Sequence, residues 1–310
     1  MKIFVTGAAG QVGSHVVDQA LSRGDEVWGI DNFSTGRPIH VAKNSRYSFV
    51  EGSIADTSLV RRLVDEFCPD VVVHTAAAYK DPDDWITDVE TNIRGMVNLI
   101  DSARRVSVGR FIYFQTALIY GIKPEQNPVG LQHPRRVDNS SYAISKGAAE
   151  DYLTISGIDY VTFRLANVIG PRNVSGPLPI FYKRLSEGKR CFVTAARRDF
   201  VYVNDLVKTV GQAINGIGHG VYHFSSGGDV PIIRLYDEVV KAMGICDYPE
   251  PDLRELSQDE APSILLDPSR TFADFGPIEF APLEVTVWNA VKYYQEFGAV
   301  GGYTHLKSET

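Results

Sequence analysis

Two side chains four residues apart, Tyr142 and Lys146, could together move a proton on and off a hydroxyl group. A helix that begins near Ser141 would place both on one face, so that their ends converge. A tyrosine hydroxyl has a pKa of about 10, and lowering it by roughly three units, about 4 kcal/mol, would make it a base at neutral pH. A neighbouring ammonium group favours that change. Thr116, at the end of an expected strand, could hold the reacting hydroxyl beside the phenol.

Three glycines near the N-terminus indicate a phosphate-binding turn. Gly7, Gly10 and Gly13 follow an apolar run and open an amphipathic segment, with Gln11 and Val12 between them. The first glycine would permit a tight turn, the second would let backbone approach a pyrophosphate, and the third would let helix and strand pack closely. The helix N-terminus that follows is itself an anion site. We therefore expect a dinucleotide to bind here.

Asp31, at the end of the second expected strand, indicates which dinucleotide binds. A carboxylate there would accept a hydrogen bond from the adenosine ribose and repel a 2′-phosphate, which favours NAD over NADP. Arg37 could instead serve a phosphate, but a surface arginine in a loop is the simpler interpretation. The glycine turn could lack a ligand, and Tyr142 and Lys146 could belong to an ordinary amphipathic helix. Because both motifs occur together and in this order, we favour an NAD-dependent enzyme that moves a hydride to and from a hydroxyl-bearing carbon.

These residues need a scaffold, and short apolar runs alternating with segments of helical period provide one. The expected strands are residues 3–6, 26–30, 48–51, 71–74, 111–115 and 160–165. This alternation predicts an α/β protein with a Rossmann-type, doubly wound parallel sheet whose ligand crevice lies at the carboxyl ends of the strands. Glycines and prolines interrupt the pattern after residue 167, where helices are expected at 232–242 and 284–297. We predict an NAD-binding domain, residues 1–166 with a returning segment around 200–225, and a smaller, mainly substrate-binding α/β lobe, residues 167–310.

Composition excludes several other classes of protein. A chain of 310 residues is long enough for one large domain and a smaller lobe. Its three cysteines lie far apart, which argues against a disulfide framework and fits a cytoplasmic protein. A net charge of −7 argues against a nucleic-acid partner, and no apolar run is long enough to span a membrane. The histidines are scattered without metal-ligand spacing, so no metal is expected.

The chain resembles the extended short-chain dehydrogenase/reductase family, and within it the nucleotide-sugar epimerases typified by UDP-galactose 4-epimerase. The resemblance covers most of the chain and includes the GxxGxxG spacing, which differs from the GxGxxG of ordinary dehydrogenases. The segments that carry it are residues 6–13, 31–36, 74–77, 91–95, 115–121, 142–146, 164–171 and 198–205.

The resemblance implies an NAD site built from many of these segments. Its residues would be Gly7, Gly10, Gln11, Val12, Gly13, Asp31, Asn32, Phe33, Ser34, Thr35, Gly36, Ser53, Ile54, Thr75, Ala76, Ala77, Asn92, Tyr142 and Lys146. Ser53 stands where relatives usually have an aspartate near adenine, so this contact is expected to be weaker or remade.

For the substrate, the resemblance implies that Thr116 orients a sugar hydroxyl, Asn167 touches the sugar diphosphate and Arg198 clamps phosphate oxygens. Alternatively, Asn167 caps a turn and Arg198 forms a structural ion pair with Asp199 or Asp205. Ser257 replaces a second phosphate-binding arginine of many relatives, and the loop before Arg198 is short, so the nucleotide is not fixed by resemblance.

Ala117 and Leu118 follow Thr116 where the sugar dehydratases of the family have an acidic pair, and the family's uronate decarboxylases use a glutamate near this loop. Epimerisation needs only hydride transfer and one proton shuttle. The resemblance therefore implies an NAD-dependent nucleotide-sugar 4-epimerase that acts on a UDP-hexose or UDP-hexuronic acid through a transient 4-keto sugar. The alternatives are net oxidation or reduction of a nucleotide sugar, and an NAD-sensing scaffold without catalysis.

Two further features follow from the resemblance. Residues 79–85 resemble a subgroup associated with bacterial surface-polysaccharide genes, although the acidic pair Asp83 and Asp84 more simply caps the next helix. Residues 84–106 and 141–156 correspond to helices that relatives pack into a four-helix seam, which implies a homodimer.

Overall fold

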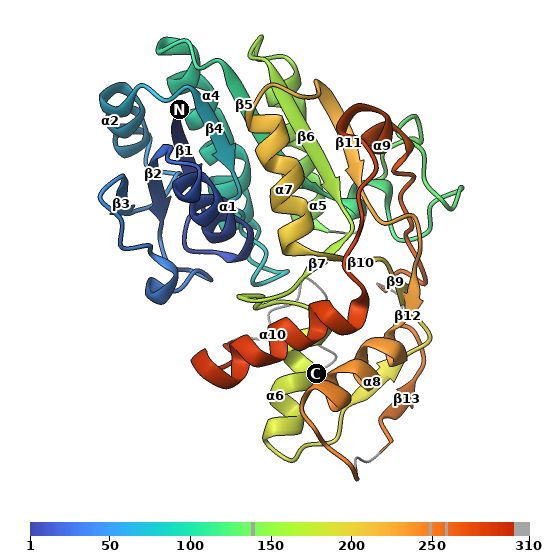
Figure 1. Cartoon of the computed structure of the whole chain (residues 1–310). Helices are drawn as coiled ribbons and strands as arrows, with labels where there is room; N and C mark the ends of the chain where they lie inside the picture. The colour runs from blue at the N-terminus through green and yellow to red at the C-terminus, as the bar shows by residue number, and fades with distance from the viewer. Residues whose placement is uncertain (138–139, 248–249, 258–259, 301–310) are drawn as a thin grey trace.

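The computed structural model describes residues 1–137, 140–247, 250–257 and 260–300 (Figure 1). A seven-stranded sheet forms its upper part, with strand order β11-β6-β5-β4-β1-β2-β3 and every pair of neighbours parallel. The strands are β1 (Lys2–Thr6), β2 (Glu26–Asp31), β3 (Tyr47–Glu51), β4 (Val71–His74), β5 (Arg110–Thr116), β6 (Tyr160–Leu165) and β11 (Gly220–Phe224). The order reverses beside β1, which lies between β2 and β4, and the carboxyl ends of the strands on either side of such a reversal leave a crevice.

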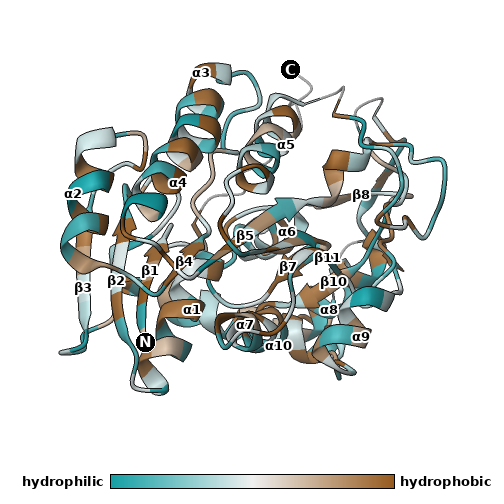
Figure 2. Cartoon of the chain, turned by 90° about the horizontal axis from the view of Figure 1, so that it is seen from above, coloured by the Kyte–Doolittle hydropathy of each residue, from teal (hydrophilic) through white to brown (hydrophobic). Residues whose placement is uncertain are grey.

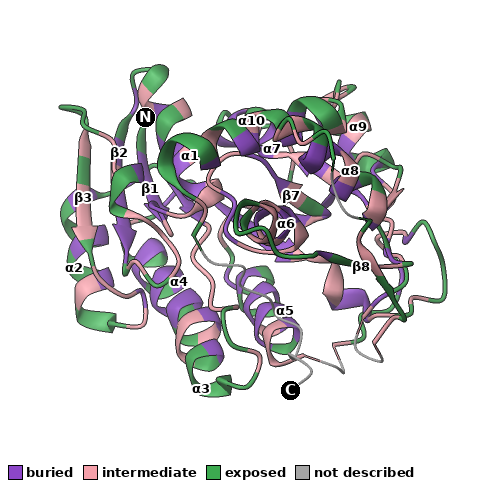
Figure 3. Ribbon diagram, turned by 90° about the horizontal axis from the view of Figure 1, so that it is seen from below, coloured by how far each residue is buried: buried purple, intermediate pink, exposed green. Residues whose placement is uncertain are grey.

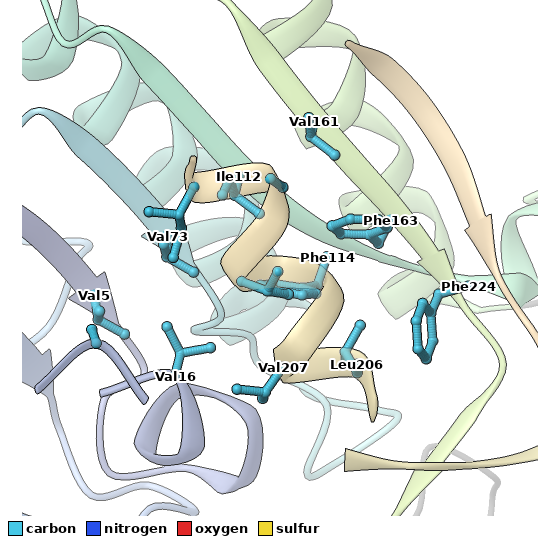
Figure 4. Packing of buried hydrophobic residues seen from close by; sticks show 14 of the residues in the cluster. Val5, Val16, Val73, Ile112, Phe114, Val161, Phe163, Leu206, Val207 and Phe224 are labelled. Carbon is cyan, nitrogen blue, oxygen red and sulfur yellow. The ribbon is translucent and has the colours of Figure 1, made fainter. Parts of the chain in front are cut away.

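Helices cover both faces of this sheet, which explains why its strands are almost continuously apolar. One face is covered by α1 (Gln11–Ser22) and α7 (Val203–Ile214), the other by α2 (Thr57–Phe67), α4 (Gly95–Arg105) and α5 (Ser141–Thr154) (Figure 2). Val16 of α1 and Leu206 of α7 pack toward the sheet residues Val73 and Phe114 (Figure 4). The buried faces of the helices turn toward the sheet and their outer faces are exposed (Figure 3). The crevice therefore rests on a rigid three-layer core.

A π-helical turn (Val89–Arg94) joins α3 (Trp85–Asp88) to α4 without a break in the helix. Asp84 caps the N-terminus of this helix, since its carboxylate accepts a hydrogen bond of 3.0 Å from the Thr87 amide. The capping interpretation of this aspartate is thus confirmed.

The lower part of the molecule holds a second core among α6 (Pro177–Ser186), α8 (Ile232–Ala242) and α10 (Leu283–Phe297). Three two-stranded pairs lie beside it: β7 (Asn167–Ile169) with β10 (Phe200–Tyr202), β9 (Arg197–Arg198) with β12 (Val230–Pro231), and β8 (Phe192–Thr194) with β13 (Asp252–Arg254). Short helices at Pro38–His40, Ala117–Tyr120 and α9 (Ser269–Phe275) complete the described elements.

The predicted fold class is confirmed. All six expected strands occur within one residue of their expected ends, as do the helices expected at 232–242 and 284–297. After β7 the chain returns to the large sheet through α7 and β11 before it enters α8. In the described part of the chain, no helix is long and apolar enough to cross a membrane.

Candidate active site

A cleft of about 370 Å³ lies at the carboxyl ends of β1, β2, β4 and β5, a volume suited to small ligands. Asn173, Pro177 and Phe200 of the lower part of the molecule also line it. Most of the residues expected from the sequence line it: Gly7, Gly10, Gln11, Val12, Asp31, Asn32, Ser34, Thr35, Ser53, Ile54, Thr75, Ala76, Ala77, Thr116, Tyr142 and Asn167. Six expected residues do not line it, namely Gly13, Phe33, Gly36, Asn92, Lys146 and Arg198.

The glycine turn brings the N-terminus of α1 to the cleft. Gly7 has φ of +65°, and a Cβ there would lie 2.7 Å from the Ala76 nitrogen. Gly13 lies behind the cleft, where a Cβ would come within 2.2 Å of the Gly7 carbonyl oxygen. Glycine at both positions therefore lets helix, strand and loop meet.

The cleft at this helix N-terminus fits an anionic dinucleotide. The buried Gln11 Nε2 has no hydrogen-bond partner among the described residues, and it lies in the first turn of α1. Backbone N–H groups at a helix N-terminus are likewise free to bind an anion. Gly10 leaves room for a pyrophosphate to approach both sets of donors.

Backbone amides hold the Asp31 carboxylate in place in the lining of the cleft. Its carboxylate accepts hydrogen bonds from the Ala9 amide at 2.9 Å and from the Phe33 amide at 2.8 Å. Burial raises its pKa, although these amide bonds oppose the change. Phe33 packs against Phe49 rather than into the cleft. Gly36 leaves room for the Asp31 carboxylate, because a Cβ at Gly36 would lie 2.8 Å from it.

Asn92 lies behind the cleft in the π-helical turn. Its Oδ1 accepts a hydrogen bond of 2.8 Å from the Ala78 amide, and its Nδ2 donates to the Ala78 carbonyl oxygen at 3.0 Å and to Ser145 Oγ at 2.9 Å. The side chain therefore ties the loop after β4 to helix α5. In this arrangement it positions the wall of the cleft.

Tyr142 and Lys146 lie on α5 as the spacing predicts. Tyr142 faces the cleft, whereas Lys146 is buried, and its Nζ lies 4.0 Å from the centroid of the Tyr113 ring. Burial lowers the pKa of Lys146 to about 7, opposed by the charge of Glu150 one turn along the helix. Burial raises the pKa of Tyr142, and Tyr79 and Asp88 add to this.

Thr116 is fixed relative to α5 through Gln115, which the sequence did not single out. Gln115 Nε2 donates to the Lys146 carbonyl oxygen at 2.7 Å, and its Oε1 accepts from the Thr116 amide at 2.7 Å. Thr116 Oγ1 accepts a hydrogen bond of 3.2 Å from the Leu118 amide, which leaves its own proton free to donate. A hydroxyl bound at Thr116 would therefore keep its place relative to Tyr142.

The two expected substrate residues differ in position. Asn167 lines the cleft and its Nδ2 donates to the Asp199 carbonyl oxygen at 3.3 Å. Arg198 points elsewhere: it donates to the Ala261 carbonyl oxygen at 2.7 Å and pairs with Glu260 at 3.5 Å. A phosphate-binding role for Arg198 would require it to leave these partners, and the role stays a prediction.

Several lining residues were missed from the sequence. Those with polar side chains are Tyr79, Thr87, Thr91, Gln115, Asn173 and Ser175. The Tyr79 ring lies edge-on to the Tyr142 ring, with centroids 6.3 Å apart. Thr87 and Thr91 are one helical turn apart, a spacing that could have indicated a shared face.

The electrostatic character of the cleft limits its chemistry. Among the residues described, Asp31 is the one charged side chain of the lining, and it lies away from Thr116 at the end of β2. Beside Thr116, a 3-10 helix carries Ala117 and Leu118. Across residues 1–137, 140–247, 250–257 and 260–300, no group of three or more acidic, histidine or cysteine side chains could hold a metal ion.

Known proteins are similar in both sequence and structure. Residues 3–222 match the NAD dependent epimerase/dehydratase family. A UDP-glucose 4-epimerase of Mycolicibacterium smegmatis is 32% identical over 274 residues, which cover 81% of this chain and 85% of that protein.

Two crystal structures of enzymes from Bordetella bronchiseptica are also similar. WbmH, in complex with NAD⁺, is 62% identical with a TM-score of 0.95, over 96% of this chain and 99% of that chain. WbmG, in complex with NAD and UDP, is 37% identical with a TM-score of 0.90, over 99% of this chain and 98% of that chain. With the glycine turn, the Asp31 carboxylate and the cleft that holds Tyr142, these matches establish that the chain belongs to the NAD-dependent epimerase/dehydratase family.

Proposed function

We propose that this protein is an NAD-dependent 4-epimerase of a UDP-hexose or UDP-hexuronic acid. The observation that carries the proposal is that Tyr142 and Thr116 line the same cleft as the glycine turn and Asp31. The family includes dehydratases, but among the described lining residues no carboxylate lies beside Thr116 to serve as their acid and base. Epimerisation needs no such carboxylate.

In the proposed mechanism, Tyr142 takes the proton of the sugar 4-hydroxyl and later returns it. Bound NAD would supply a hydride acceptor and a positive charge near the phenol. That charge matters because burial alone raises the pKa of Tyr142. Lys146, one turn along α5, would lower the pKa of the phenol and bind the nicotinamide ribose, and Thr116 would hold the reacting hydroxyl by a hydrogen bond.

The stereochemical inversion requires the hexose to turn over while the nucleotide stays anchored. WbmG has been crystallised with NAD and UDP together, which supports UDP as the anchored group here. Asn167, in the lining, is proposed to contact the sugar diphosphate. Arg198 is proposed to clamp phosphate oxygens after it leaves Glu260. A firm hold on UDP and a loose hold on the sugar would follow.

The test is to incubate the purified protein with UDP-, GDP- and dTDP-sugars and to follow the products by NMR. A 4-epimer formed without net change in NADH supports the proposal. Stoichiometric production or consumption of NADH would instead indicate a dehydrogenase or reductase, and no turnover of any sugar would favour an NAD-sensing scaffold.

Replacing Tyr142 by Phe is expected to remove the base and to reduce kcat by about a thousandfold or more, because general base catalysis contributes about 10² to 10⁴. NAD binding, measured by fluorescence titration, should change little. Turnover at the wild-type rate would contradict the assignment of Tyr142 as the base.

We further propose a homodimer that pairs through the helical segment 85–105 and through α5. These elements carry exposed apolar side chains, which a partner copy would cover: Trp85, Ile86, Val89, Val97, Ile144 and Tyr152, with Ile155 just after α5. Large exposed apolar patches of this kind mark protein interfaces.

The division into an NAD-binding domain (residues 1–166, with the return through 200–225) and a substrate-binding lobe (167–310) is proposed on the same basis. The expected NAD-binding residues of the cleft lie at the carboxyl ends of strands in the large sheet, whereas Asn167 and Arg198 belong to the lower part of the molecule. We also propose a cytoplasmic location, which fits the three free cysteines. A role in making surface polysaccharide is proposed because residues 79–85 resemble a subgroup associated with bacterial surface-polysaccharide genes.

A further inference from the structure

Helix α10 reaches the glycine turn through a short chain of hydrogen bonds that no catalytic role explains. The segment after Asp31 runs through Arg37 to a 3-10 helix (Pro38–His40). Arg37 N and His40 Nδ1 both donate to the Ala9 carbonyl oxygen, at 3.1 Å and 2.7 Å. The Ala9 amide in turn donates to Asp31. Ala9 therefore connects the ribose-binding carboxylate with His40.

His40 then contacts α10. A carbonyl oxygen only accepts, so Nδ1 carries the proton of the neutral ring and Nε2 accepts from the Tyr293 hydroxyl at 2.6 Å. Burial lowers the pKa of His40 to about 4, which keeps the ring neutral near pH 7. Both nitrogens are thus used, and the side chain bridges Ala9 to Tyr293.

Arg37 makes the second link to the same helix. Its guanidinium donates to the carbonyl oxygens of Phe297 at 2.8 Å and Gly298 at 3.1 Å, and to the Tyr293 hydroxyl at 3.4 Å. These carbonyls end α10, where the helix dipole favours a cation. The surface-arginine interpretation is therefore incomplete, because Arg37 holds the C-terminus of a helix.

The same helix also holds the other side of the turn. The hydroxyl of Tyr294, buried in α10, donates to the Asn173 carbonyl oxygen at 2.9 Å, and Asn173 Nδ2 donates to Gln11 Oε1 at 3.1 Å. Asn173 and Gln11 both line the cleft. Helix α10 thus fixes the phosphate-binding turn at Ala9 and at Gln11, on the two sides of Gly10.

We infer that Arg37, His40 and Tyr293 are positioning residues for NAD, a latch that ties the ribose-binding loop to α10 and sets how slowly the cofactor dissociates. For the adenosine half of NAD to leave, the segment that lines the cleft from Asp31 to Thr35 has to move away, and the latch resists this movement. Slow release suits a reaction that returns its hydride within each turnover. The inference rests on the proposed NAD-dependent function but not on the identity of the sugar.

The test measures dissociation of NAD directly, without a sugar substrate. Wild type, Tyr293→Phe, Arg37→Met and Arg37→Lys are loaded with radiolabelled NAD⁺ and chased with excess unlabelled NAD⁺, and the bound label is followed by rapid filtration. Tyr293→Phe removes one hydroxyl and keeps the ring, so release should accelerate about three- to tenfold, the worth of one hydrogen bond. Arg37→Met should be at least as fast, and Arg37→Lys should restore part of the slow release.

Tyr160→Phe is the matched control. It removes an exposed hydroxyl that bonds Thr154 at 3.3 Å, away from the cleft, and should release NAD at the wild-type rate. Release within twofold of wild type in both Tyr293→Phe and Arg37→Met overturns the inference. So does a fall in melting temperature that is equal with and without NAD while the release rate stays unchanged, since this would show a structural role only. If NAD release is altered as expected but no sugar is epimerised, the proposed function fails and the latch stands.

Discussion

Lys146 shows at the scale of one residue how a buried charge opposes stability. The side chain is 4% exposed, and burial lowers its pKa to about 7 from the ordinary 10.5. Between these two values the unfolded chain binds more protons than the folded one, so stability rises with pH through this window. Below pH 7 the lysine is protonated in both the folded and the unfolded protein, so burying its charge lowers the free energy of unfolding by the largest amount.

Replacing Lys146 by Met should therefore stabilise the NAD-free protein, by on the order of a few kcal/mol at pH 6.5. The gain should shrink as pH rises from 7 toward 10.5, while catalytic turnover is lost. Urea unfolding of wild type and variant at pH 6.5 and 9.5 gives both differences. Lys189→Met, at an exposed site, is the control and should change neither value. A variant less stable than wild type at pH 6.5 would show that the ammonium is well solvated in the fold.

The placement of Tyr142 and Lys146 on one helix and of Asp31 at a strand end was predictable from the sequence, because helical spacing and the end of an apolar run are local patterns. The contacts of Gln115 and Tyr79 were not. Gln115 matters through a bond to a backbone carbonyl of a helix distant in sequence, and Tyr79 through the ring of Tyr142. Neither contact leaves a local pattern.

At the scale of the element, the glycine turn was predictable because closely spaced glycines between an apolar strand and a helix form a local sequence pattern. A Cβ on Gly13 would lie 2.2 Å from the Gly7 carbonyl oxygen, so helix α1 could not stay against β1 with any larger residue at this position. The π-helical turn was not predictable, since a helix with one extra residue in a turn has nearly the same apolar period as a regular one over so short a stretch.

Gly13→Ala should accordingly displace α1 from the end of β1. We expect the free energy of unfolding to fall by about 1 to 3 kcal/mol, as in other overpacked cores, and NAD affinity to fall at least tenfold. Thermal unfolding and fluorescence titration with NAD measure the two effects. Gly130→Ala is the control, because a Cβ at Gly130 meets no atom within 4 Å. Wild-type affinity in Gly13→Ala would exclude close packing as the role of this glycine.

At the scale of the whole molecule, the sequence predicted the sheet and its ligand edge but not the full strand order. Expected strands of 4 to 6 residues in alternation with helices imply parallel pairing through right-handed crossovers. That β11 pairs with β6 after the intervening α6, α7 and small strands depends on non-local packing. The same holds for α10, which is distant from the glycine turn in sequence and reaches it through His40 and Asn173.

The proposed dimer is tested at this scale. Ile144 on α5 is 51% exposed, and an aspartate there would place a charge in the proposed interface. Light scattering with size-exclusion chromatography should give a dimer for wild type and a monomer for Ile144→Asp, with the helical content unchanged by circular dichroism. Ile217→Asp, on a different surface and 39% exposed, should remain dimeric. A wild-type monomer at working concentration would rule the dimer out.

The π-helical turn between α3 and α4 has one more consequence. Each residue of a regular helix turns the chain by about 100°. One extra residue taken up in a single turn therefore shifts the side-chain positions of the later part by about that angle relative to those of the earlier part. Trp85 and Ile86 can therefore look outward on the first segment while Met96 and Leu99 look inward on the second, with Asn92 at the change of phase. Deleting one residue here would remove more than one hydrogen bond. It would rotate the two parts of the helix relative to each other, so that the exposed Trp85 and Ile86 and the buried Met96 and Leu99 could not all keep their present orientations.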